Sequence, residues 1–202
     1  MFIYGVPMSK PPASLRERKR QMTADLLADT AMALFQERGF KVVTMDEIAS
    51  RAEVARGTLY SYFPVKEALL SHYFGQHLQR SLPDIMAQLA GLTDPLQRLH
   101  AFLLGSAVHL ESYRDFFGPY LQYRFAHPES PDSGSSRLFL HLLEEARVAG
   151  QLRGELAPEV LLDYLRNLVL GALHRWLHSG ETLQAEYERM WQFFLHGAAR
   201  PV

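Results

Sequence analysis

The chain has 202 residues, of which 48% are hydrophobic and 21% charged, a composition ordinary for a globular protein with a sizeable core. It contains no cysteine, which excludes disulfides, thiol catalysis and cysteine-ligated zinc. The formal net charge of −1 is unevenly distributed: ten Lys/Arg and seven Asp/Glu between Lys10 and Lys66 give +3, and eleven basic and fifteen acidic residues elsewhere give −4. This division agrees with a nucleic-acid-binding part joined to a second, mildly acidic part.

The chain begins with a short apolar stretch that does not resemble a signal peptide. Met1–Met8 is interrupted by Gly5 and Pro7 and lacks a basic start. No uninterrupted apolar run approaches the length of a membrane span, so we expect a cytoplasmic protein without a membrane partner. Glycine and proline are frequent in residues 1–13, which predicts a disordered arm.

Two capping boxes predict the first two helices. Ser14 and Glu17 have the S-x-x-E spacing in which each side chain bonds the backbone N–H of the other residue. The helix that follows shows apolar residues at helical spacing and a glycine, Gly39, where a C-terminal stop belongs. Thr44 and Glu47 repeat the capping box and begin a short helix that extends to about Arg51.

A third short helix is predicted from about Ala55 to Tyr62, and Pro64 ends it. The pattern downstream predicts further helices, which begin at Lys66 (with a kink or break at Pro83), Pro95, Arg114, Arg137, Pro158 and Glu181. Residues 126–136 read AHPESPDSGSS, which predicts an exposed loop. The expected fold is all-α, with about nine helices, no strand pattern and no internal repeat.

The two short helices and the turn between them, residues 44–63, are typical of a helix-turn-helix. In that motif the second helix enters the major groove, so its outward residues are short, polar or hydrogen-bonding. Arginine grips guanine O6 and N7, and the threonine methyl packs on thymine, while tyrosine hydroxyls and lysine reach phosphates. The candidate DNA-binding residues are Thr44, Met45, Arg56, Gly57, Thr58, Tyr60, Ser61, Tyr62 and Lys66. A three-helix bundle that only packs is the alternative.

These residues resemble the tetracycline-repressor (TetR) family of bacterial transcription regulators. The similarity covers roughly Arg18 to Leu70 and comprises FQERGF, the T-x-x-x-I-A-x-x-A-x-V frame from Thr44, and G-T-L-Y-x-Y-F-P-x-K-E-A-L from Gly57. The resemblance implies a three-helix DNA-binding domain followed by a helical effector-binding and dimerisation domain. We therefore expect a disordered arm at 1–13, a DNA-binding domain at 14–65 and an effector and dimer domain at 66–202.

Three positions depart from the family pattern. Glu53 stands in the turn where glycine is usual, so a non-glycine residue must adopt a left-handed conformation or the turn must differ. Ala55 replaces a serine-type helix cap, a loss of about 1 kcal/mol. Val65 replaces a polar cap before Lys66.

The central helices are rich in aromatic residues, which favours a pocket for a small apolar or aromatic effector. An ordinary aromatic core is the alternative for each ring. The candidate effector-binding residues are Phe102, Tyr113, Phe116, Phe117, Tyr120, Tyr123 and Phe139.

The last two helices are apolar on more than one face, which predicts burial on more than one side. Pairing them with their copies in a second subunit would form a four-helix dimer interface; internal packing of a monomer is the alternative. The candidate interface residues are Leu161, Leu165, Leu168, Ala172, Trp176, Tyr187, Trp191 and Phe194.

No pattern in the chain predicts catalysis or a cofactor. His174 and His178 lie one helical turn apart, but no third ligand occurs at a confirming spacing, so we expect no metal site. The primary hypothesis is a homodimeric, ligand-responsive regulator, most simply a repressor that its effector releases from a palindromic operator, with the helix from Lys66 as the lever. The alternative is a helical enzyme or carrier whose N-terminal bundle is a structural or protein-interaction module.

Overall fold

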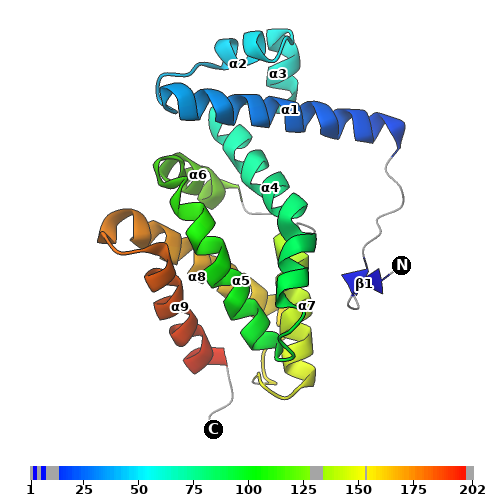
Figure 1. Cartoon of the computed structure of the whole chain (residues 1–202), viewed down its shortest axis with the longest axis vertical. Helices are drawn as coiled ribbons and strands as arrows, with labels where there is room; N and C mark the ends of the chain where they lie inside the picture. The colour runs from blue at the N-terminus through cyan, green and yellow to red at the C-terminus, as the bar shows by residue number, and fades with distance from the viewer. Residues whose placement is uncertain (1, 4–5, 8–13, 128–133, 153, 199–202) are drawn as a thin grey trace. The chain divides into compact units, whose positions relative to one another are not determined.

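The computed structural model of the chain describes residues 2–3, 6–7, 14–127, 134–152 and 154–198 (Figure 1). The chain divides into two compact units. Unit 1 comprises Met1–Gln79 with Gln122–His127, and unit 2 comprises Arg80–Leu121 with Pro128–Val202. The limits expected from the sequence, 14–65 and 66–202, concern function and stay a prediction.

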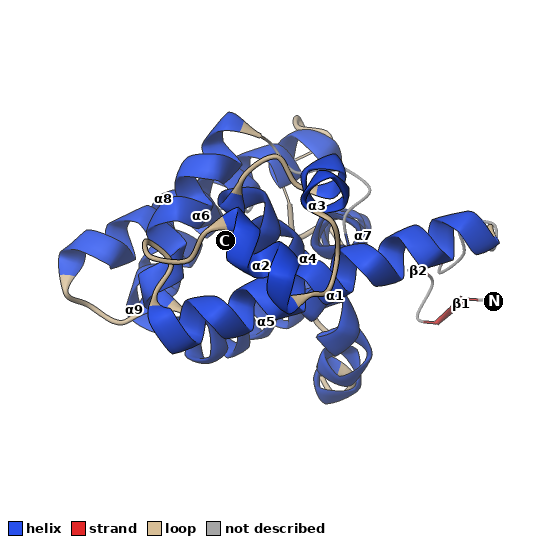
Figure 2. Ribbon diagram, turned by 90° about the horizontal axis from the view of Figure 1, so that it is seen from above, coloured by secondary structure: helices blue, strands red, loops and turns tan. Residues whose placement is uncertain are grey.

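Within the described residues the fold is all-α, as predicted. Figure 2 shows that helices make up most of it. A two-residue strand pair, β1 (Phe2–Ile3) and β2 (Val6–Pro7), is antiparallel and does not change this class. The rest of the predicted disordered arm lies outside the described residues. The helices are α1 (Leu15–Arg38), α2 (Met45–Arg51), α3 (Arg56–Tyr62), α4 (Lys66–Leu89), α5 (Pro95–Glu111), α6 (Arg114–Ala126), α7 (Gly134–Val148), α8 (Pro158–Ser179) and α9 (Leu183–Ala198).

Both predicted capping boxes are present in unit 1. At the start of α1, Ser14 N–H donates to Glu17 Oε2 at 2.7 Å and Glu17 N–H donates to Ser14 Oγ at 3.2 Å. The helix ends at Gly39, whose φ of 86° favours glycine. Figure 1 shows α2 and α3 lying along α1, where the buried faces of the three helices form the core. That core includes Leu27, Phe35, Ile48 and Leu59, and Leu69 of α4 is fully buried as well.

Four helices of unit 2 contact one another in a ring. α5 contacts α7 and α9, and α8 contacts the same two helices. Each of the four therefore has two neighbours and buries more than one side, which explains why their sequences are apolar around much of the circumference. Trp176 of α8 and Tyr187 of α9 are among the largest fully buried side chains.

Two predicted boundaries differ most clearly from the structure, and α9 begins at Leu183, two residues after the expected Glu181. Pro83 does not divide α4, which continues to Leu89. The missing proline N–H leaves the Gln79 carbonyl without its helical donor, but both residues are exposed and water can bond that carbonyl. α7 begins at Gly134, three residues before the expected Arg137; residues 128–133 of the predicted loop lie outside the described part. Among the described helices, none combines the length and the apolarity that a membrane crossing requires.

Candidate nucleic-acid interface

Helix α3 has one buried face and one polar face. Leu59 is 0% exposed and Phe63, just after the helix, is buried. Five of the predicted contact residues are exposed on the other side, and Tyr62 is half-buried; the exposed five are Arg56, Gly57, Thr58, Tyr60 and Ser61. The predicted orientation of α3 is therefore confirmed, whereas contact with DNA stays a prediction.

The turn before α3 contains Glu53 in the left-handed conformation, with φ of 54°. Val54 N–H donates to Ala49 O at 3.0 Å and Glu53 N–H donates to Ser50 O at 3.2 Å. These two bonds form a Schellman motif, in which the left-handed position usually holds glycine. The turn therefore has the geometry in which glycine is usual, and Glu53 carries the strain. Ala55 is the N-cap of α3 and makes no side-chain cap bond.

A shallow depression of about 280 Å³ brings five of the predicted contact residues together. It is lined by Thr44, Met45, Arg56, Tyr60 and Lys66, with Lys41, Val43 and Asp46. In it, Arg56 Nε donates to Asp46 Oδ1 at 2.7 Å. That pair is exposed and therefore weak, and it leaves both terminal guanidinium nitrogens of Arg56 available for a bidentate grip on a base.

Two predicted contacts at the start of α2 are engaged within the chain. Thr44 N–H donates to Glu47 Oε2 at 2.7 Å, and Thr44 Oγ1 caps the Glu47 N–H at 3.2 Å. The Thr44 N–H, and next the Arg38 guanidinium, lower the pKa of Glu47. A phosphate would have to compete with that carboxylate. Met45 is only 9% exposed, so its side chain belongs mainly to the core.

Lys66 was predicted to reach phosphate, but its ammonium is directed elsewhere. Nζ donates to the carbonyl oxygens of Phe40 and Val43, each at 2.7 Å. A phosphate contact by this residue remains an untested prediction, and it would require breaking these bonds.

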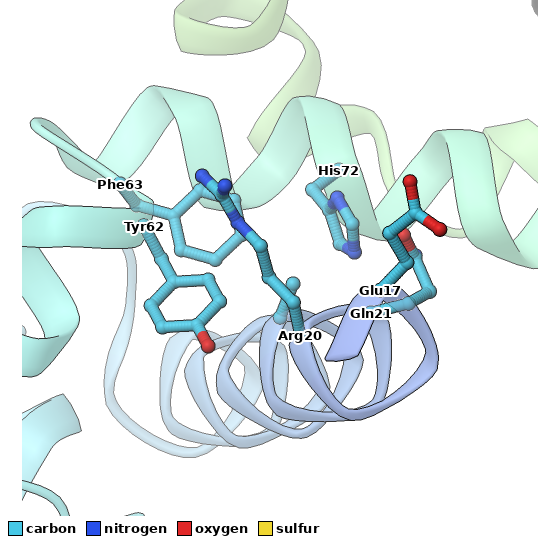
Figure 3. Close-up of a pocket in the computed structure, with 7 residues that line it drawn as sticks. Glu17, Arg20, Gln21, Tyr62, Phe63 and His72 are labelled. Atoms are coloured by element: carbon cyan, nitrogen blue, oxygen red, sulfur yellow. The ribbon is translucent and has the colours of Figure 1, made fainter. Parts of the chain in front are cut away.

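A second depression, of about 310 Å³, lies where α1, α3 and α4 meet (Figure 3). The Arg20 guanidinium stands 5.8 Å from the centroid of the Tyr62 ring. His72 Nε2 lies 2.8 Å from Asp25 Oδ1, and its ring meets Phe63 edge-on at 5.2 Å. These contacts fix the end of α3 against α1 and α4, and they hold Tyr62 beside a cation.

Sequence reasoning missed two members of the interface, Lys41 and Asp46. Lys41 lies in the segment before α2 and Asp46 in its first turn. Their basic and acidic side chains were visible in the sequence, but only the packing of α2 on α3 shows that both border the same depression as Arg56. An ordinary first-turn acid at a helix N-terminus gives no sign of such a partner.

The predicted effector residues are divided between the two units: Tyr123 belongs to unit 1 and the other six to unit 2. Phe102 and Phe139 meet edge-on at 5.4 Å between α5 and α7. Phe117 contacts Tyr120 and Trp176 at 5.3 and 5.5 Å, and the ring of Tyr113 contacts His109. Phe116 is buried, and Tyr123 stacks on His127 in unit 1. Neither of the depressions described above lies among the aromatic rings of unit 2.

Most of the predicted dimer residues are buried inside their own chain, and their contact with a second copy stays a prediction. Seven of the eight are at most 5% exposed, and Leu168 is half-buried. The seven are Leu161, Leu165, Ala172, Trp176, Tyr187, Trp191 and Phe194. Helical spacing identifies an apolar face, but it cannot tell whether the same chain or a second copy covers that face.

Different residues occupy the outer faces of α8 and α9. Tyr164 is 57% exposed and Phe193 is 69% exposed, and Val160 and Gly171 are exposed as well. His174 and His178 lie on the outer side of α8, with ring centroids 4.7 Å apart. Among the described residues, no third histidine or carboxylate joins them in a group that could hold a metal ion.

The fold and the exposed face of α3 define a helix-turn-helix protein. The model of the family "Bacterial regulatory proteins, tetR family" matches residues 27–73, which include α2 and α3. The match covers the helix-turn-helix part of the chain, and the relatives described next are similar to it in this part and beyond it.

The chain is similar to regulators over part or all of its length. An HTH-type transcriptional regulator of Mycobacterium tuberculosis, MT1294, is 36% identical over 85 residues, which span 42% of this chain and 42% of that relative. The HTH-type transcriptional repressor KstR2 of Rhodococcus jostii is 26% identical over 207 residues, which span 96% of this chain and 99% of that repressor.

The fold is also that of solved TetR-type structures. Thermus thermophilus FadR, a TetR family transcriptional repressor in complex with lauroyl-CoA, matches with a TM-score of 0.71 and 28% identity over 86% of this chain and 94% of that one. RolR in complex with resorcinol has a TM-score of 0.72 at 22% identity, over 92% of each chain, and supports the fold alone.

The left-handed Glu53 generates a prediction about stability. Glu53→Gly should raise the free energy of unfolding by about 1 kcal/mol, because glycine adopts this conformation without the Cβ clash. Glu144, exposed within α7, provides the control: Glu144→Gly should lower the same quantity by about 1 kcal/mol. Urea unfolding followed by circular dichroism measures both. A loss of stability in Glu53→Gly would contradict the assigned strain.

Proposed function

We propose that the protein is a ligand-responsive DNA-binding regulator, and that it represses transcription until a small effector releases it from a palindromic operator. The observation that carries this proposal is α3, whose polar face is exposed while Leu59 anchors its other face. Relatives named as transcriptional repressors support it and favour a regulator over a helical enzyme or carrier. Its place would be the bacterial cytoplasm, where operator DNA lies.

In the proposed complex, α3 reads bases and its surroundings hold the backbone. Arg56 and Thr58 would face base edges, and Tyr60, with the cation of Arg20 beside Tyr62, would face phosphates. A palindrome requires two copies of α3 on one face of the duplex, about 34–36 Å apart. The protein would therefore act as a homodimer.

We place the dimer interface on the outer faces of α8 and α9. Exposed aromatic side chains on a bundle whose interior is already filled are candidates for burial by a second copy. Tyr164 and Phe193 supply such surface, and the exposed Gly171 has no atom within 4 Å of an added Cβ, so a partner backbone can approach closely. The proposed interface therefore uses the two helices that the sequence predicted, but different residues of those helices.

The effector would bind in unit 2, where aromatic rings and a few polar groups converge. Phe117, Tyr120 and Trp176 form an aromatic group, and the Arg114 guanidinium lies 4.9 Å from the centroid of the Trp176 ring. Burial, and next Tyr120, raise the pKa of Tyr187, so its hydroxyl stays a proton donor. α4 and α6 each have residues in both units, and α4 is one covalent link through which binding could be transmitted.

The base-reading and phosphate-holding roles of α3 are separable. Arg56→Ala should relax preference at one base position, at a cost of about 1–3 kcal/mol for the preferred sequence. Tyr60→Phe should weaken binding to every sequence by about 1 kcal/mol, through loss of one hydroxyl contact. Gel shifts on a site selected from a random DNA pool measure both, with Arg147→Ala on α7 as control. The assignment fails if neither variant differs from the control.

Disrupting the outer face of α9 should dissociate the dimer. Phe193→Arg places a charge at the proposed interface and should weaken self-association at least about tenfold. Val148, 88% exposed at the end of α7, provides the matched control Val148→Arg, which should remain dimeric. Sedimentation velocity across a concentration series distinguishes them. A wild-type chain that is monomeric throughout would remove the interface altogether.

An apolar effector should weaken DNA binding, roughly 5–150-fold for an ordinary allosteric coupling. Lauroyl-CoA and resorcinol are suitable probes, with coenzyme A alone as the control for the acyl chain. The chain has two tryptophans, Trp176 and Trp191, both buried in unit 2, so their fluorescence should change with the effective probe. If neither probe changes fluorescence or DNA affinity, this effector class is wrong.

A further inference from the structure

Two exposed histidines lie one helical turn apart near the C-terminal end of α8. The ring centroids of His174 and His178 are 4.7 Å apart, and the ring planes are tilted by 35°. Imidazole is a ligand that Zn²⁺, Ni²⁺ and Cu²⁺ accept. Metal–nitrogen bonds of about 2.0–2.1 Å place the centroids of two imidazoles on one ion roughly 4–6 Å apart. The observed spacing therefore permits both rings to bind the same ion.

The backbone of α8 determines which nitrogen of His178 is available to an ion. Its Nδ1 lies 2.8 Å from the carbonyl oxygen of His174. Because a carbonyl only accepts hydrogen bonds, Nδ1 carries the proton, and in the neutral ring Nε2 then has the free lone pair. Histidines that bind metal ions usually donate their other ring N–H to a carbonyl or a carboxylate. His178 therefore already makes the hydrogen bond that orients a metal ligand.

The charges around the two histidines do not oppose a cation. Both lie near the end of α8, which is Ser179, and the C-terminal end of a helix carries partial negative charge. The Arg114 guanidinium bonds two carbonyls of this end and offsets part of that charge. Arg175 lies between the histidines in sequence, and its Nε donates to Glu186 Oε2 at 3.1 Å. Neither arginine therefore leaves an uncompensated positive charge beside the pair.

One chain supplies only half of a transition-metal site. Zinc takes four ligands in most protein sites, and among the described residues no third histidine or carboxylate joins this pair. The pair lies on the same outward stripe of α8 as Tyr164 and Gly171, because these positions follow helical spacings of seven, three and four. That stripe belongs to the proposed dimer interface. A two-fold interface uses the same patch of both copies, so a second pair of imidazoles is available there.

We propose that His174 and His178 form half of a binding site for a divalent metal ion that prefers imidazole, such as Ni²⁺, Cu²⁺ or Zn²⁺, and that the same pair of a second copy completes it. The proposal rests on the proposed dimer and adds a ligand to it. One ion is then held by four imidazoles and joins the two α8 helices near their C-terminal ends. Because the complete site exists only in the dimer, the ion strengthens self-association by mass action.

Calorimetric titration with Ni²⁺ tests the site on the full chain without an affinity tag. We expect one ion per two chains, and no binding of Mg²⁺, which prefers oxygen ligands. His174→Gln and His178→Gln should each weaken Ni²⁺ binding at least about tenfold, because a chelate loses its intramolecular advantage with each ligand removed. His127 is the matched control, since it is exposed and its Nδ1 also bonds the carbonyl four residues earlier, at 3.1 Å. His127→Gln should leave Ni²⁺ binding unchanged.

Two further variants test whether the second copy completes the site. Phe193→Arg retains both histidines but opposes the proposed interface, so its affinity for Ni²⁺ should fall at least about tenfold, whereas Val148→Arg should bind Ni²⁺ as the wild-type chain does. In sedimentation velocity, saturating Ni²⁺ should strengthen self-association of the wild-type chain at least about tenfold and leave that of His178→Gln unchanged.

The outcomes separate this proposal from the proposed function. Retained Ni²⁺ affinity in both histidine variants would overturn it, and so would one ion per chain with unchanged self-association. If the chain is dimeric without the ion and binds no Ni²⁺, the metal site is wrong and the dimer stands. If the chain stays monomeric with and without Ni²⁺, both the site and the proposed interface are wrong. Gel shifts on the selected DNA site decide the DNA-binding function independently of either result.

Discussion

The pose of α3 depends on contacts outside α3. A helix of seven residues is far below the length at which isolated helices persist in water, about 12–15 residues, and its cap position holds an alanine. The burial of Leu59 therefore supplies the main constraint, and it fixes which side faces solvent. The left-handed Glu53 sets the angle at which the chain enters the helix, and the Arg20–Tyr62 contact holds the other end. The proposed DNA-contacting face of α3 is therefore held in place only by these contacts.

Unit 2 obeys a different constraint, because its helices are covered on several sides by their own neighbours. The ring of α5, α7, α8 and α9 already buries Trp176 and Tyr187, so an apolar residue on these helices is not evidence of a partner. What requires explanation is the apolar surface left outside, at Tyr164 and Phe193. The proposed dimer follows from that remainder.

Local signals in the sequence predicted the elements well, and relations between elements poorly. The capping boxes at Ser14 and Thr44, and the all-α class, follow from rules that act within one turn of helix, and the structure confirms them. The buried dimer candidates and the carbonyl partners of Lys66 depend on which segment covers which. Lys66 bonds residues 23 and 26 positions away, and no periodicity encodes such a contact. At Glu53 the sequence predicted either a left-handed residue or a different turn. The φ of 54° shows that the first alternative is correct.

The acidic residues around α3 explain why the proposed regulator would need two copies. Asp46 pairs with Arg56, and Glu47 caps α2 beside Thr44, so each protomer brings negative charge close to the phosphates it is proposed to contact. Such charges lower the affinity for any DNA duplex. The loss is greatest at nonspecific sites, because binding there is almost entirely electrostatic. A single α3 would then bind weakly. Joining two by the outer faces of α8 and α9 makes the second contact intramolecular and raises affinity without new cations. Operator recognition and dimer formation would therefore be coupled, and a palindrome with wrongly spaced half-sites would lose that gain.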